Sequence, residues 1–133
     1  MSSIRCADMV VCLGETLVLI ERLSAPCGLA LPGGKCEPGE TTTETICREL
    51  KEETGLTACI EGIVGTFDAE GRDPRGPYVT DVYYGSAYGV VYEETYKTRV
   101  VLLPVRCVKQ EQARFVLDHY SIIEQYLRLV KRL

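Results

Sequence analysis

Residues 48–56 read RELKEETGL, a stretch with three glutamates and a closing Gly-Leu pair. The glutamates are Glu49, Glu52 and Glu53. Positions three and four apart share one face of an α-helix, where like charges destabilise the helix by roughly 0.2–0.5 kcal/mol per pair. Gly55 follows as a helix stop, so we predict a helix over Thr41–Thr54. The repulsion on its acidic face needs an explanation.

Two explanations are open for the glutamate cluster. One is a solvated acidic surface, relieved by the neighbouring Arg48 and Lys51, as charge runs usually are. The other is a bound cation, which the surroundings favour, since Gly33 and Gly34 lie just upstream and Glu40 precedes the helix. Three carboxylates directed at one point suit a hard divalent cation, so we expect Mg²⁺, with Mn²⁺ as the alternative.

The composition is that of an ordinary globular domain. The 133 residues are 46% hydrophobic and 26% charged, which is enough chain for one domain with a core. Fifteen basic and nineteen acidic residues give a net charge of −4, so we expect no general attraction to nucleic acid or to anionic membranes. No apolar run is long enough to span a bilayer, and the N-terminus lacks the pattern of a signal peptide.

The seven cysteines are an odd number and include no CxxC pair. This pattern predicts reduced thiols, packed mostly in the core, in a cytoplasmic protein. Zinc is a poor alternative, because the ligand spacings are wrong and His119 is the only histidine. We expect His119 to be structural, near the start of the last helix.

Hydrophobic periodicity predicts the other elements. An amphipathic pattern indicates a C-terminal helix over Leu117–Leu133. Apolar and β-branched runs between turn residues predict strands at residues 9–13, 16–22, 29–31, 57–67, 78–88 and 98–108. With one helix after the third strand and another at the end, this order indicates an α/β fold with a mixed sheet flanked by helices.

The glutamate cluster is part of a longer pattern. Gly34, five residues, Glu40, seven residues and then RELKEETGL resemble the complete signature of the Nudix hydrolases. At average residue usage, such a match occurs by chance with a probability on the order of 10⁻⁹ per start position. Leu29–Gly34 resembles the strand and turn that enter the signature, with leucine where a tryptophan is common. Phe115–Ile123 resembles the start of the family's closing helix.

The resemblance implies a single Nudix domain over residues 1–133, an α/β/α sandwich with a mixed β-sheet between helices. It also implies metal-assisted hydrolysis of a nucleoside diphosphate linked to another group. Arg48 would orient the carboxylates through charge-assisted hydrogen bonds. The implied metal ligands are the backbone carbonyl of Gly34 and the side chains of Glu40, Glu49, Glu52 and Glu53. The general base is open among Glu49, Glu93 and Glu94.

The loop at residues 71–77, GRDPRGP, bears on the substrate. It resembles a run found in the ADP-ribose pyrophosphatase branch of the family and in related regulators that bind ADP-ribose. Arg72 and Arg75 would suit a diphosphate or a ribose phosphate, although a surface turn with paired Arg and Asp is the alternative. The branch commonly has a proline before this run, where this chain has Glu70-Gly71. Arg22 is a further candidate for anion binding, or a surface charge at a strand end.

ADP-ribose is therefore the favoured substrate, with AMP and ribose 5-phosphate as products. The alternatives are a (deoxy)nucleoside triphosphate pyrophosphohydrolase, a diadenosine polyphosphate hydrolase and a sensor that binds ADP-ribose without cleaving it. The intact set of arginine and glutamates argues against the sensor, as does the lack of chain for a DNA-binding module. The sequence leaves a homodimer open.

Overall fold

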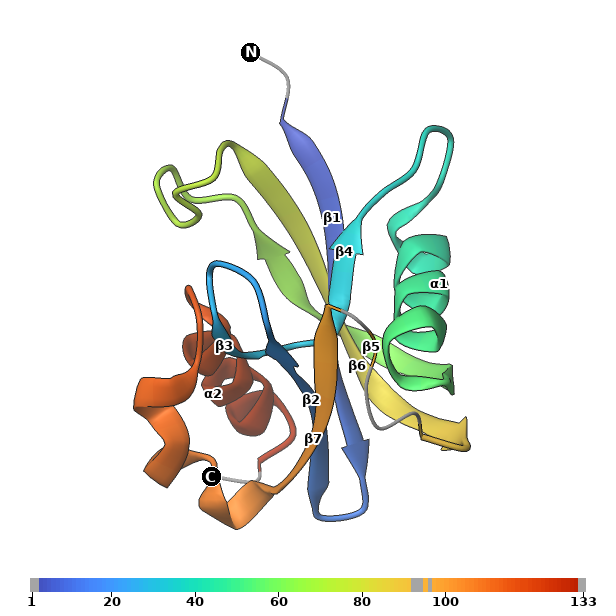
Figure 1. Cartoon of the computed structure of the whole chain (residues 1–133), viewed down its shortest axis with the longest axis vertical. Helices are drawn as coiled ribbons and strands as arrows, with labels where there is room; N and C mark the ends of the chain where they lie inside the picture. Colours follow the sequence, from blue (N-terminus) through green and yellow to red (C-terminus); the bar gives the residue numbers. More distant parts are fainter. Residues whose placement is uncertain (1–2, 92–94, 96, 132–133) are drawn as a thin grey trace.

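The computed structural model describes residues 3–91, 95 and 97–131. This part of the chain forms seven strands, two α-helices and two short 3₁₀ helices (Figure 1). In chain order they are β1 (Ile4–Leu13), β2 (Thr16–Arg22), β3 (Gly28–Ala30), β4 (Gly33–Lys35), α1 (Thr42–Thr54), β5 (Leu56–Phe67), β6 (Tyr78–Gly89), β7 (Thr98–Pro104), η1 (Val105–Cys107), η2 (Lys109–Arg114) and α2 (His119–Leu129).

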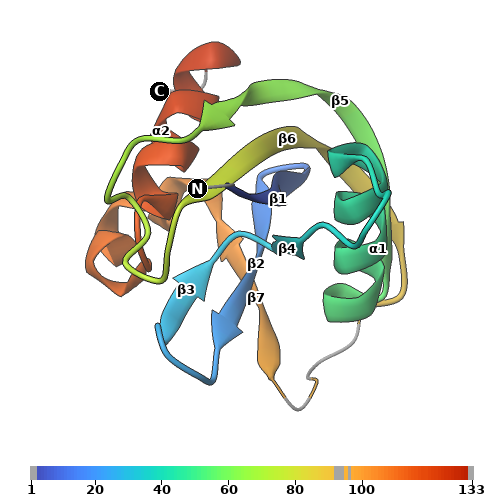
Figure 2. The same ribbon diagram turned by 90° about the horizontal axis from the view of Figure 1, so that it is seen from above.

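The strands form one mixed sheet between the two helices. Its main path runs β3-β2-β1-β6-β5, while β4 pairs with β1 and β7 pairs with β2. The β1–β6 pair is parallel and the other pairs are antiparallel. Both views place α1 on one side of the sheet and α2 on the other, as Figure 2 shows from above. The predicted α/β architecture is confirmed.

Strand β1 contributes side chains to the core on both faces of the sheet. Because successive side chains in a strand point to opposite faces, Met9 and Val11 pack on the side of α1, with Ile46 and Leu50 of that helix. Val10 packs on the side of α2. The same alternation places Asp8 on the α2 side, two residues before Val10. β1 therefore places a carboxylate on the same face of the sheet as the apolar cluster that contains Val10.

Local sequence accounts for both ends of α1. The Thr41 hydroxyl accepts the backbone N–H of Glu44, whose carboxylate accepts the backbone N–H of Thr41, a reciprocal capping box. Gly55 ends the helix at φ 82°, a left-handed conformation that glycine adopts without steric cost, and its N–H donates to the Lys51 carbonyl. The predicted bounds of this helix are confirmed.

Several other predicted elements need correction. The first strand begins at Ile4 rather than at residue 9. The last strand ends at Pro104 rather than at 108, because its partner β2 begins opposite, at Thr16, and the chain turns into η1 from Val105. The C-terminal helix begins at His119 rather than Leu117, whose positive φ of 51° is not helical. β4 was predicted as a turn; its strand conformation depends on pairing with β1.

The expectation that the cysteines are mostly core residues is wrong. Only Cys6 is buried, three are partly exposed and three are exposed. Cys47, one of the cysteines expected to lie mostly in the core, is on the solvent side of α1. None of the seven, all within the described ranges, forms a disulfide. Of the helices in the described ranges, none is long and apolar enough to cross a bilayer.

His119 joins α2 to the rest of the fold, in agreement with its predicted structural role. Its Nδ1 accepts the backbone N–H of Leu31 at 2.9 Å, and the side chain is buried. This acceptor role requires a neutral ring. Burial, the dominant cause, lowers the pKa of His119 from 6.5 to about 4.

We predict that His119 makes folding less favourable as the pH falls from 6.5 to 4. In this window the unfolded chain binds a proton at His119 that the folded chain does not, so stability is lost on acidification. A shift from 6.5 to about 4 corresponds to about 3 kcal/mol. His119→Asn keeps an acceptor for the Leu31 N–H but cannot titrate. Urea unfolding from pH 7 to pH 4 should therefore show the variant gaining about 3 kcal/mol relative to wild type.

Comparing His119→Asn with wild type cancels the contribution of the other titrating groups to the pH dependence of stability, since Asp8 and the remaining carboxylates are present in both proteins. A stability difference that stays constant from pH 7 to pH 4 would mean that the folded protein protonates His119 normally.

Candidate active site

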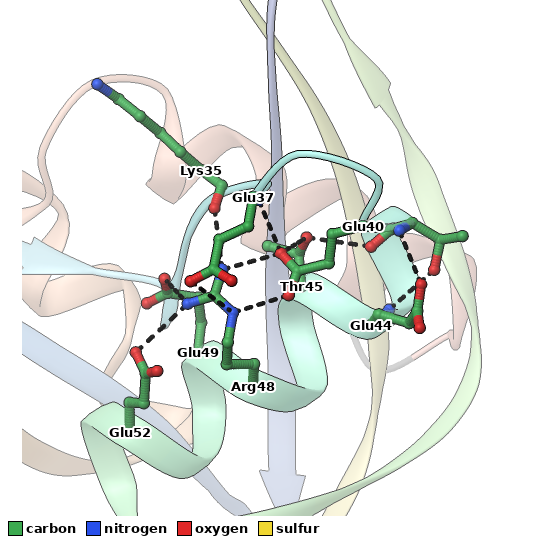
Figure 3. Close-up of polar contacts among 9 residues, drawn as sticks. Lys35, Glu37, Glu40, Glu44, Thr45, Arg48, Glu49 and Glu52 are labelled. Atoms are coloured by element: carbon green, nitrogen blue, oxygen red, sulfur yellow. Dashed lines mark hydrogen bonds and ion pairs between the residues drawn. The ribbon is translucent and has the colours of Figure 1, made fainter.

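Arg48 on α1 gathers the carboxylates of the signature. Its Nε and Nη2 donate to the two oxygens of Glu40 at 2.8 and 2.9 Å, a bidentate pair (Figure 3). Its Nη1 donates to Glu49 at 2.8 Å and to Glu52 at 3.4 Å, and Nη2 also reaches the Lys35 carbonyl. One planar guanidinium thus links the loop before α1 to two glutamates one turn apart. These contacts suit the orienting role inferred for Arg48.

Glu53 faces a different partner. Its Oε1 accepts the backbone N–H of Gly33 at 2.8 Å, which ties the C-terminal half of α1 to β4. Burial raises the pKa of the Glu53 carboxyl to about 8. Burial also raises the pKa of Glu49, against the opposing effect of Arg48. Hydrogen bonding to Arg48 instead lowers the pKa of Glu40 to about 2.

The three glutamates line one cleft but have different hydrogen-bond partners. Glu49 and Glu52 turn toward Arg48, while Glu53 turns toward Gly33. Within the described ranges, no group of three or more His, Cys, Asp or Glu side chains is arranged to hold a metal ion. The donor set nonetheless fits a hard cation. Burial raises the pKa of both Glu49 and Glu53, and a divalent cation bound between them would favour their charged forms.

Glycine is required beside the glutamates. A Cβ on Gly34 would lie 2.7 Å from the carboxylate carbon of Glu49 and 2.8 Å from its Oε1. Such contacts are shorter than van der Waals packing allows, so a larger residue would displace Glu49. The backbone carbonyl of Gly34 is one of the inferred metal ligands, and it belongs to β4.

Two hollows share one lining residue. A cleft of about 300 Å³ is lined by Glu49, Glu52, Glu53, Arg22, Lys97 and Thr98, among others. A cavity of about 90 Å³ is lined by Asp8, Arg22, Gly33, Arg72, Arg75 and His119, among others. Arg22 lines both. Arg22, the predicted anion-binding residue of β2, therefore contacts both the cleft of the signature glutamates and the cavity of the arginine loop.

The two loop arginines both reach the cavity, but each is bound to a carboxylate of the protein. Arg72 is almost fully buried and forms a bidentate pair with Asp118 at 2.7 and 2.8 Å. Arg75 pairs with Asp73 at 2.7 Å and its guanidinium lies 5.1 Å from the centre of the Tyr78 ring. The pairing of Arg and Asp that the sequence left as an alternative is therefore present. Arg75, with a 40% exposed side chain, is the more accessible of the two.

Of the predicted general bases, Glu93 and Glu94 lie outside the described residues. Glu49 lies in the cleft. The sequence analysis missed Asp8, Lys35 and Lys97, which line the hollows. For Asp8 a signal existed, because it is the one carboxylate in the strand IRCADMVVCL. No such sequence signal existed for Lys35 and Lys97, since a lysine in a predicted turn is ordinarily a surface charge.

Known proteins share this fold and signature. Residues 3–123 match the family model of the NUDIX domain, so the chain belongs to the Nudix family. It is 39% identical over 79 residues to an ADP-ribose pyrophosphatase of Methanocaldococcus jannaschii, covering 57% of this chain and 46% of that protein. It is 32% identical over 82 residues to a putative 8-oxo-dGTP diphosphatase of Bacillus subtilis, covering 60% and 52%. The matched part thus spans about half the length of these curated relatives.

Solved structures agree on the fold. The NUDIX domain of Shewanella oneidensis NrtR, solved in complex with ADP ribose, superposes with a TM-score of 0.84 at 25% identity and covers 98% of this chain and 90% of that one. A NUDIX hydrolase of Nitrosomonas europaea superposes with a TM-score of 0.82 at 20% identity, covering 94% and 88%. The architecture is therefore that of the family across almost the whole chain.

We predict that Mg²⁺ binds at these glutamates and stabilises the folded protein. At a concentration 100 times its Kd, a ligand adds about 2.7 kcal/mol, which is roughly 10 °C in Tm for a domain of this size. Glu52→Gln and Glu53→Gln should each lose most of this increase, because each removes a charged oxygen ligand. Glu53→Gln should not lower the Tm of the metal-free protein, since it removes a buried charge.

Differential scanning fluorimetry with and without Mg²⁺ measures both effects. Glu61→Gln, an exposed glutamate on β5, is the matched control and should respond to Mg²⁺ as wild type does. A full Mg²⁺ response in the Glu52 and Glu53 variants would contradict the assignment.

Proposed function

We propose that this protein hydrolyses the pyrophosphate bond of a nucleoside diphosphate linked to another group, with ADP-ribose as the favoured substrate and AMP and ribose 5-phosphate as products. The observation that carries the proposal is that Arg22 lines both hollows. One holds the signature glutamates, and the other holds the arginine loop. A substrate with phosphates in its middle and a group at each end suits such a paired site.

Local charge supports an anionic substrate. The chain as a whole carries a net charge of −4, yet five basic side chains line the two hollows. They are Arg22, Lys35, Arg72, Arg75 and Lys97. Clustered positive charge inside concave walls raises the local concentration of anions. Phosphate groups would therefore be drawn to a site whose carboxylates otherwise repel them, provided that a cation is bound as well.

Mg²⁺ or Mn²⁺ would be held by Glu49, Glu52, Glu53 and the Gly34 carbonyl. When bound, the cation supplies neutralisation of the phosphates and activation of water. Glu40, the fifth inferred ligand, is bound by Arg48 on both oxygens and would act mainly by holding that arginine in place. Arg48 in turn holds Glu49 and Glu52.

The residues of the chain also provide for proton transfer and phosphate binding. Glu49 would serve as the general base, since burial raises its pKa and brings it closer to the working pH. Glu93 and Glu94 stay alternative bases. Arg22 and Lys97, which line the cleft with the glutamates, would bind the phosphates.

Relatives support this choice and also the second candidate. The relative from Methanocaldococcus jannaschii is an ADP-ribose pyrophosphatase, and the NUDIX domain from Shewanella oneidensis was solved with ADP ribose. The relative from Bacillus subtilis is a putative 8-oxo-dGTP diphosphatase, which favours hydrolysis of a nucleoside triphosphate as the alternative.

A substrate panel with Mg²⁺ tests the proposal. We expect ADP-ribose to be cleaved faster than dGTP, 8-oxo-dGTP or dATP at equal concentration, with AMP and ribose 5-phosphate released. The triphosphate alternative expects a nucleoside monophosphate and inorganic pyrophosphate. Chromatography of the products separates the two, and the Glu53→Gln variant, expected to be slower by about 100-fold or more, controls for contaminating activity. A preference above tenfold for a triphosphate would overturn the substrate assignment.

Replacing either loop arginine should lower activity on ADP-ribose. Arg75→Ala should lower kcat/KM for ADP-ribose by about 10- to 100-fold, mainly through KM, because it removes charge-assisted bonds to the substrate. Its Tm should also fall, because the buried carboxylate of Asp73 loses its ion-pair partner. Arg72→Ala should lower both activity and stability, because it leaves Asp118 without its buried partner.

Kinetics and thermal unfolding of both variants provide the measurement, with Arg114→Ala, an exposed arginine in η2, as the control. If both variants cleaved ADP-ribose as well as wild type, the loop would be only a structural turn.

A further inference from the structure

We propose that Asp8 recognises the hydroxyl groups of the sugar attached to the nucleoside diphosphate, and thereby favours a nucleoside diphosphate sugar over a nucleoside triphosphate. The inference rests on the proposed function and assigns a specificity-determining residue to it. Asp8 lies on β1, outside the signature and outside the arginine loop.

Asp8 is a largely buried carboxylate that lacks a hydrogen-bond donor within the described residues. Its side chain is 13% exposed. Nε2 of the neutral His119 ring lies 3.7 Å from Oδ2, which is too far for a hydrogen bond. A carboxylate removed from water without donors is costly. Such a group is retained where a ligand supplies what the protein does not.

The other two aspartates near the cavity show the contrast. Asp118 accepts two bonds from Arg72, and Asp73 is bound by Arg75. Both are satisfied inside the protein. Asp8 is the one cavity-lining carboxylate of the described residues that still has its full capacity to accept.

The backbone opposite Asp8 leaves room for its carboxylate. Gly33 on β4 pairs with Asp8 on β1, and a Cβ on Gly33 would collide with Asp8 Oδ1 and with the Ala7 carbonyl. Only glycine fits at this position. On its other side, Gly33 donates its N–H to Glu53. A single glycine thus separates the carboxylate of the cavity from a carboxylate of the inferred metal site.

This placement orients a substrate. If its phosphates lie at the glutamate cleft and Arg22, the group attached to them enters the cavity and meets Asp8. The cavity volume is about 90 Å³. It suits the hydroxylated face of a small sugar ring better than a whole nucleoside.

Hydrogen-bond chemistry explains the selectivity. Arg75 and Lys35 both lie near the Tyr78 ring and line the same cavity as Asp8. Asp8 is an acceptor without a donor among the described residues. Ribose hydroxyls can donate to it, whereas a terminal phosphate offers acceptor oxygens in place of those donors. The adenine amino group is also a donor, so the experiment must separate the two ends of the substrate.

The test compares wild type with Asp8→Asn on three substrates: ADP-ribose, the methyl ester of ADP, which lacks the sugar, and IDP-ribose, which lacks the adenine amino group. We expect the variant to lose about 10- to 100-fold in kcat/KM on ADP-ribose. The same loss is expected on IDP-ribose, and a change of less than twofold on the methyl ester. Asp68→Asn, the same chemical change on an exposed loop residue, should leave all three rates unchanged.

Each other outcome has a definite meaning. An equal loss on ADP-ribose and on the methyl ester, or no loss at all, would overturn the role of Asp8 while the proposed function stands. A loss on ADP-ribose that is absent on IDP-ribose would assign Asp8 to the base and overturn the proposal. If wild type cleaves neither ADP-ribose nor its methyl analogue, the proposed function fails and this inference fails with it.

Folding of the variant is checked independently. Asparagine is nearly isosteric with aspartate and carries no buried charge, so Asp8→Asn should melt no lower than wild type. If it fails to fold, Asp8→Ser replaces it in the same three-substrate comparison, with the same expected pattern.

Discussion

The hydrogen bond from the Gly33 N–H to the Glu53 carboxylate determines where the acidic helix lies on the sheet. It joins α1 to β4, and β4 is joined to β1 by backbone pairing. On one side of this connection lie the remaining glutamates, and on the other lies Asp8. A Cβ at Gly33 would collide with Asp8, and one at Gly34 would collide with Glu49, so the two glycines of β4 leave room for both carboxylates.

The site contains buried carboxylates whose desolvation is not offset by the rest of the protein. Burial raises the pKa of Glu53 to about 8 and that of Asp8 to about 7, so both carboxylates resist ionisation in the protein alone. Perturbed carboxylates gathered around a cleft are typical of functional sites, where a ligand completes the charge balance. A cation near Glu53 would stabilise its charged form, and a hydroxylated group near Asp8 would supply hydrogen-bond donors. A substrate that fills both hollows would gain both contributions.

The candidate site was predictable where its residues are neighbours in sequence. The capping residue Thr41, the stop at Gly55 and the spacing of the glutamates define α1 without reference to anything distant. The orientation of the glutamates was not predictable, since it depends on Arg48 contacting Glu40 across a loop and on Glu53 contacting Gly33 on another element. Likewise Cys47 has a helical position that looked internal, yet the sheet covers a different face of α1.

The sequence by itself determined the family signature, the acidic helix and the alternation of buried and exposed residues along the strands. These features depend on residues that are close together in the chain. Only the tertiary structure decided that Arg22, Arg72 and Asp8, distant along the chain, line one cavity. It also decided that β4 is a strand and that the loop arginines are bound by Asp118 and Asp73. Those outcomes follow from strand pairing and from the docking of α2, which bring distant residues together and leave no periodic trace in the sequence.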